Sequence, residues 1–240
     1  LQTMLGTTRM IRHRVIKCFG VGESDLEAML PDMIRRGREP QVGITVHAAT
    51  ISLRITTNTE TDAEAATLAQ PTLDTSRVWL GTLVYGEGDD ELEHAVLRLL
   101  AEQGTSLATA EWGTNGLMSH WLENAAQDRP MYAGGIVLNG VQSLRNVLGE
   151  YAPPDEELRD RKTRVRAMAE HGRRQWGATW GLAIGDAPTA ADSDAPRIWV
   201  ALAGPDGTVC HPFTYTGHPD ILVPRAAKQA LNFLRLKLLE

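Results

Sequence analysis

Three short apolar runs in the second half of the chain constrain its fold more than any other feature. They occupy residues 133–138, 180–184 and 197–203 and have the length of strands without polar alternation. Such runs are typical of central strands that are covered on both faces. Helical segments are predicted around them, at 90–102, 155–175 and 224–239. Because strands and helices alternate, we predict an α/β fold with a layered sheet.

The first part of the chain has a different pattern, that of a small α+β unit. Two helices are expected there, one with Ser24 as its N-cap and one that begins at Thr61 and is limited or kinked by Pro71. Polar and apolar alternation predicts strands at 9–19, 42–47, 50–56 and 78–85. We therefore expect a small α+β domain over 1–85, followed by a three-layer α/β/α domain over 86–240.

Composition narrows the class of protein. The 240 residues carry a net charge of −6, which disfavours nucleic acid as a partner. No run approaches the ~20 apolar residues of a membrane helix, and the N-terminus lacks the apolar core of a signal peptide. With only two cysteines, we expect a cytoplasmic protein. The seven histidines show no metal-ligand spacing, so we expect neither a metal nor a cofactor. The chain begins at Leu1 rather than Met, and we expect it to be a fragment.

Several segments, in order along nearly the whole chain, resemble the CinA family of competence/damage-inducible proteins. In that family a middle domain precedes a nicotinamide-nucleotide amidase domain. The resemblance is carried by FGVGESDLE at 19–27, SLRIT at 52–56, LGTLVYGE at 80–87, LATAEWGTNG at 107–116, residues 134–150, RAMAEHGR at 166–173 and residues 225–238. It implies the α/β/α fold, a homodimer, and a preceding nucleotide-processing domain that is absent from this sequence.

The resemblance also places the chemistry. The family is thought to hydrolyse the amide of nicotinamide mononucleotide with a serine nucleophile, assisted by a tyrosine and a lysine. Those three positions fall here on Trp112, Asn139 and Leu144. An indole has no nucleophilic atom, and neither an amide nor an isobutyl group can serve as a base. We therefore expect no catalytic residues in this chain.

What remains is a predicted ligand pocket that has lost its chemistry. It is formed by the turn after a strand, together with one residue that follows another strand: Glu111, Trp112, Gly113, Thr114, Asn115, Gly116 and Asn139. Thr114 is expected to cap the following helix, and Glu111 to have a structural role beside the helix start. If Trp112 and Trp180 both reach this pocket, they either close it or form an aromatic binding surface.

Two functions stay open at this point. The first is a catalytically inactive CinA-like protein whose role is to bind a pyridine nucleotide or a related small molecule, to dimerise or to regulate. The alternative is a working amidohydrolase on nicotinamide mononucleotide with a relocated nucleophile. The hydroxyls near the turn are those of Thr109, Thr114, Ser119 and Ser143. An interaction module in DNA uptake or damage response has little support from the charge pattern.

Overall fold

The computed structural model describes residues 9–127, 130–189 and 196–240. It divides into two compact units, Leu1–Glu91 and Leu92–Glu240, and each is described by itself. The prediction that the chain is a fragment rested on Leu1, which lies outside the described residues. The structure confirms the mixed α/β class. In the described ranges, no helix is both long and apolar enough to cross a membrane.

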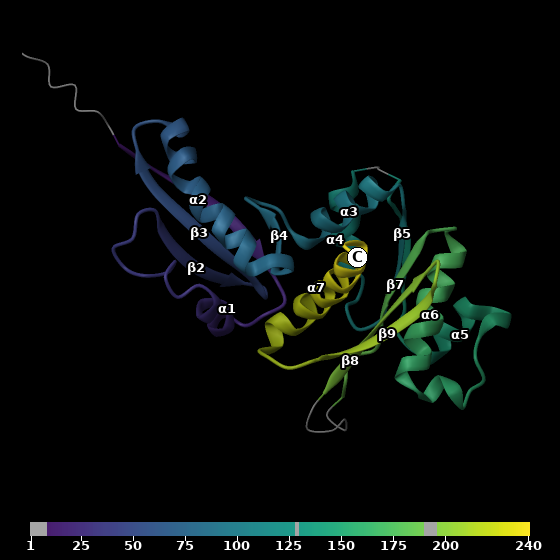
Figure 1. Ribbon diagram of the computed structural model, residues 1–240. Coiled ribbons are helices and arrows are strands. Elements are labelled where there is room, and N and C mark those ends of the chain that lie inside the picture. The colour runs from purple at the N-terminus through teal and green to yellow at the C-terminus, as the bar shows by residue number, and fades with distance from the viewer. Residues whose placement is uncertain (1–8, 128–129, 190–195) are drawn as a thin grey trace, which may run out of the picture. The chain divides into compact units, whose positions relative to one another are not determined.

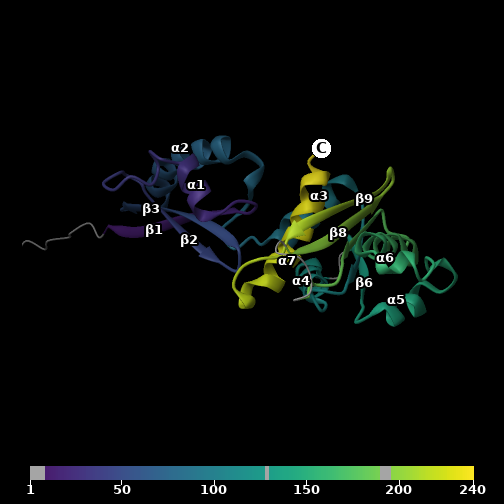
Figure 2. The ribbon, with the colours of Figure 1, turned by 90° about the horizontal axis from the view of Figure 1, so that it is seen from below.

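The first unit is an antiparallel sheet with two helices on one face (Figure 2). The strands follow the order β2-β3-β1-β4, and Ile16, Leu53 and Ile55 point from the sheet into the core. Helix α2 begins with a capping box, in which Thr61 and Glu64 each bond the other's backbone. The elements are β1 (Met10–Cys18), α1 (Glu23–Met29), β2 (Gln41–His47), β3 (Thr50–Thr59), α2 (Asp62–Leu80), the 3-10 turn η1 (Gly81–Leu83) and β4 (Val84–Glu87).

Two predictions for this unit were wrong, the N-cap of the first helix and the start of the last strand, and Pro71 does not end the second helix. The N-cap of α1 is Gly22, without a side-chain cap, so Ser24 lies inside the helix. Helix α2 continues through Pro71, and the strand predicted at 78–85 begins only at Val84. The apolar residues at the end of α2 resemble a strand in sequence. In the structure they belong to the helix, and Val78 is 78% exposed.

The second unit is a three-layer α/β/α sandwich around a five-stranded sheet. Its strands follow the order β6-β5-β7-β8-β9; β6, β5 and β7 are parallel, whereas β7, β8 and β9 are antiparallel. Helices α3, α4 and α7 pack on one face and α5 and α6 on the other (Figure 1). The elements are α3 (Leu92–Gln103), β5 (Leu107–Glu111), α4 (Leu117–Ala126), β6 (Tyr132–Val137), α5 (Val141–Leu148), the 3-10 turns η2 (Gly149–Tyr151) and η3 (Glu157–Arg159), α6 (Arg161–Gln175), β7 (Trp180–Ile184), β8 (Arg197–Gly204), β9 (Gly207–Thr214) and α7 (Pro219–Leu238).

The three apolar runs are strands, as predicted, but only two of them are internal strands of the sheet. The run at 180–184 is the central strand β7, and the run at 197–203 is the internal strand β8. The run at 133–138 corresponds to β6, which lies at the edge of the sheet and leaves Val137 56% exposed. Its two glycines and short apolar side chains match a buried strand in composition, so sequence alone did not reveal the open side.

Close packing of β7 against α6 makes Gly181 a sensitive position. A Cβ atom there would lie 2.1 Å from the carbonyl oxygen of Ala169 and 2.8 Å from Cβ of Arg173. We predict that Gly181→Ala lowers the free energy of unfolding by about 3 kcal/mol, the upper part of the range for overpacking. Calorimetry should show a lower Tm, whereas Gly140→Ala, where a Cβ meets no atom within 4 Å, should change little. Equal stability of the two variants would contradict the packing described.

Candidate functional site

The candidate site lies where the three parallel strands end. The backbone N–H of Trp112 donates to Ile184 at 3.1 Å, and that of Gly113 donates to Gly185 at 3.0 Å. The N–H of Leu138 donates to the carbonyl of Glu111 at 2.7 Å. These bonds bring together the segments that follow β5, β6 and β7. In open α/β sheets, ligands bind at this carboxyl edge.

The side chain of Trp112 packs against an apolar cluster. Trp112 is half-buried, and the cluster it contacts includes Leu138, Leu144, Leu158 and Val165. Leu144 is fully buried. Two of the three positions where the resemblance implies reactive groups therefore belong to one patch of apolar packing.

A buried guanidinium covers the indole of Trp112. The Cζ atom of Arg164 lies 5.6 Å from the ring centroid, within the range of a cation–π contact. Arg164 makes a bidentate bond to Asp186, in which Nη2 lies 2.8 and 3.0 Å from the two carboxylate oxygens. Its Nη1 donates to the carbonyls of Leu158 and Arg159 at 2.7 and 2.9 Å. Arg164 is thus held rigidly under Trp112.

The buried carboxylate of Glu111 anchors the turn to helix α4. It is fully buried and accepts four hydrogen bonds. The backbone N–H groups of Met118 and Ser119 donate at 3.0 and 2.6 Å, and the hydroxyls of Thr114 and Ser119 each donate at 2.5 Å. The N-cap residue, Gly116, has no side chain for this purpose, so Glu111 satisfies the free N–H groups of the first turn.

A chain of hydroxyls continues from Glu111 into β6. Thr109 Oγ1 lies 2.9 Å from Ser119 Oγ and 2.8 Å from the hydroxyl oxygen of Tyr132. Ser119 donates its one hydroxyl hydrogen to Glu111, so Thr109 donates to Ser119 and Tyr132 donates to Thr109. Burial raises the pKa of Tyr132, against the effect of its bonds to Ser119 and Thr109. The phenol therefore stays protonated and acts as the terminal donor.

The backbone of the turn needs its unusual residues. A Cβ on Gly113 would lie 2.7 Å from the carbonyl oxygen of Gly185, so only glycine allows this close approach. Asn115 and Gly116 have φ angles of +53° and +86°. Asparagine tolerates this left-handed region better than other side chains, which explains how Asn115 can take a position where the resemblance implies glycine.

The structure brings most of the predicted residues together but changes some of their roles. Residues 111–116 form the turn, and Asn139 is exposed just after β6, with its backbone N–H bonded to Ser143. Thr114 is not the N-cap; its hydroxyl bonds Glu111 instead. Trp180 does not reach the site, because it begins β7 beside Leu107, at the opposite end of the strands.

Sequence reasoning missed Arg164 and Asp186 as parts of the site. Arg164 lies in the charged helical segment predicted at 155–175, yet it is only 7% exposed. Its place directly before Val165, on the same segment as the apolar residues 167–169, was the only signal. Across the described segments, no group of three or more His, Cys, Asp or Glu side chains could hold a metal ion.

Comparisons with known proteins give one consistent family. Residues 13–86 match the family described as "Damage-inducible protein CinA KH domain", and residues 89–238 match the "CinA C-terminal domain". A "CinA-like protein" of Frankia casuarinae is 33% identical over 96% of this chain and 55% of its own length, and one of Anaeromyxobacter sp. is 34% identical over 94% and 56%. The chain thus spans about half the length of these relatives.

A solved structure resembles part of the chain. A competence-damaged protein (CinA) superfamily protein from Klebsiella pneumoniae aligns with a TM-score of 0.55 and 25% identity, over 62% of this chain and 96% of its own.

The anchoring role of Glu111 can be tested by charge removal. We predict that Glu111→Gln lowers the free energy of unfolding by about 3 kcal/mol, because an amide presents N–H donors to groups that are themselves donors. Urea denaturation should measure this loss. The control is Glu123→Gln, at an exposed position on α4, the helix that Glu111 anchors. This change should alter stability by less than about 0.5 kcal/mol. Equal effects in the two variants would contradict the anchoring role.

Proposed function

Because this chain belongs to the CinA family, we propose that it is a catalytically inactive member that binds a pyridine nucleotide or a related small molecule without hydrolysing it. The proposal depends on one observation above all. Trp112 packs against the cluster that contains the fully buried Leu144, where the resemblance implies a serine and a lysine. With Asn139 at the third position, these three positions hold neither a nucleophile nor its base.

The remaining geometry supports binding. One side of the Trp112 ring is covered by Arg164, and the ring is half-buried, so part of it is accessible to a planar ligand. Asn139 follows β6, the strand next to β5, and its exposed amide is available as a hydrogen-bonding group. Because Asp186 and the two carbonyls hold Arg164, the ring is fixed before a ligand arrives, which reduces the entropy lost on binding.

The alternative, a relocated nucleophile, has one candidate pair. Ser119 Oγ donates to Glu111 at 2.5 Å, and a hydrogen bond of this kind joins a nucleophile to its base. Glu111, however, already accepts two backbone N–H groups and the hydroxyl of Thr114, which occupy its remaining lone pairs. Its contacts therefore favour helix anchoring over proton transfer.

The proposal extends to the setting of the protein. We propose a cytoplasmic homodimer that acts with a preceding nucleotide-processing domain, with a regulatory role and with neither nucleic acid nor membrane as a partner. The support is the family resemblance and the net charge of −6.

We predict that the purified chain releases ammonia from nicotinamide mononucleotide only at the background rate. Loss of a nucleophile–base unit costs on the order of 10⁶-fold in turnover in a serine protease. A coupled ammonia assay makes the measurement. Release at the rate of an enzyme would overturn the proposal, and its loss in Ser119→Ala would establish the relocated nucleophile instead.

Binding should be visible in tryptophan fluorescence on the same samples. We predict a saturable change when nicotinamide mononucleotide is added, and loss of most of that change in Trp112→Phe, because Phe keeps the packing but removes the indole signal. The control is Trp79→Phe, in the first unit, which should keep the change. An unchanged signal in Trp112→Phe would place any binding elsewhere.

A further inference from the structure

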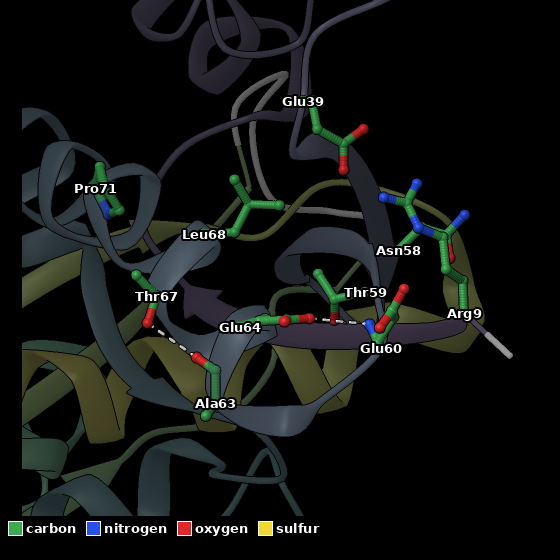
Figure 3. A pocket seen from close by; sticks show the side chains of 10 residues that line it. All are labelled: Arg9, Glu39, Asn58, Thr59, Glu60, Ala63, Glu64, Thr67, Leu68 and Pro71. Carbon is green, nitrogen blue, oxygen red and sulfur yellow. Dashed lines mark hydrogen bonds between the residues drawn. The ribbon is translucent and has the colours of Figure 1, made fainter. Parts of the chain in front are cut away.

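A second candidate ligand site lies in the first unit, where β3 ends and α2 begins (Figure 3). The hollow has a volume of about 950 Å³, a size that suits a small molecule. One wall is the first half of α2, including Glu64, Leu68 and Pro71, and Glu39 lies across the hollow (Figure 3). Arg9, Asn58 and Glu60 also line it.

Hydrogen bonds hold the walls of this hollow. Arg12 pairs with Asp62 at the start of α2 and donates to the carbonyl of Thr59 at 2.9 Å. Arg38 donates to Thr72 on α2 at 2.9 Å and to the carbonyl of Pro40 at 3.1 Å, which ties the Glu39 segment to the helix. The hollow is therefore formed before any ligand binds.

Opposite charges line the hollow without pairing. In the described part of the chain, the side chains of Arg9, Glu39 and Glu60 make no ion pair or hydrogen bond. Glu64 uses Oε2 to accept the backbone N–H groups of Glu60 and Thr61, at 3.1 and 3.3 Å. One cation and three carboxylates thus surround the space, with a net charge of −2.

A helix carbonyl adds an independent acceptor. Pro71 has no N–H, so the carbonyl of Thr67 lacks the donor that residue i+4 normally provides in a helix. Both Thr67 and Pro71 line the hollow. Backbone carbonyls without a helical donor favour a ligand that carries N–H groups.

We propose that this hollow binds a free amino acid with a cationic side chain, of the arginine or lysine type. Its carboxylate pairs with Arg9, and its two cationic groups lie against Glu39 and Glu60, near the carbonyl of Thr67. Its methylene groups cover Leu68. The ligand charge of +1 complements the −2 of the hollow. This site is independent of the nucleotide site proposed above.

Calorimetric titration of the purified chain with L-arginine and with L-lysine tests the proposal. We expect saturable binding at one site for at least one of them. Norleucine, which keeps the methylene chain of lysine without its ammonium group, should bind about tenfold more weakly or not at all. Glu60→Gln and Arg9→Gln should each weaken binding about tenfold, and Glu102→Gln, an exposed carboxylate in the second unit, should not.

The variants are expected to fold normally, because the Arg9 and Glu60 side chains are exposed; an unchanged Tm confirms this. No saturable binding of either amino acid by the wild-type chain overturns the proposal. Undiminished affinity in both Glu60→Gln and Arg9→Gln overturns it as well. Binding of a basic peptide without binding of the free amino acids also overturns it, because the occupant would then be a protein segment.

Discussion

The buried carboxylate of Glu111 is the contact on which the second unit most depends. A charge without exposure is costly unless several donors surround it, and here four donors come from the start of α4 and the turn before it. The same carboxylate fixes where α4 begins and how the turn leaves β5. The position of Trp112 follows from this anchor, since the turn has little freedom once both of its ends are held.

On the function proposed above, this arrangement keeps a scaffold that can orient a ligand but lacks the reactive groups that the resemblance implies. The glycine contacts, the anchored helix and the parallel strand ends are those of a site that could orient a ligand. The groups at the reactive positions are apolar or neutral instead. Arg164, held by Asp186, packs against the indole of Trp112.

The sequence predicted the fold well where periodicity and burial agree. The sequence predicted a helix that begins at Thr61, where α2 has its N-cap, and the apolar runs identified β7 and β8. The prediction failed where apolar residues are not buried in the way their composition suggests. The run at 133–138 is an edge strand, and the apolar residues Val78 and Trp79 lie at the end of a helix. The site was predicted as far as local sequence reaches, because residues 111–116 form one turn. Arg164 comes from α6 and Asp186 from the segment after β7, so the sequence around the turn could not reveal them.

The packing of Trp112 and Leu144 makes the introduction of reactive groups at these two positions strongly dependent on the order of mutations. A lysine introduced first at position 144 would carry an ammonium group into an apolar cluster that offers it no partner. Replacement of Trp112 by a small residue first would leave a cavity beside Leu138 and Val165. Each single step is destabilising before any chemistry is gained, and the protein is marginally stable like any other. On the function proposed above, these packing costs form a barrier: reactive groups could not be introduced at positions 112 and 144 one residue at a time without loss of stability.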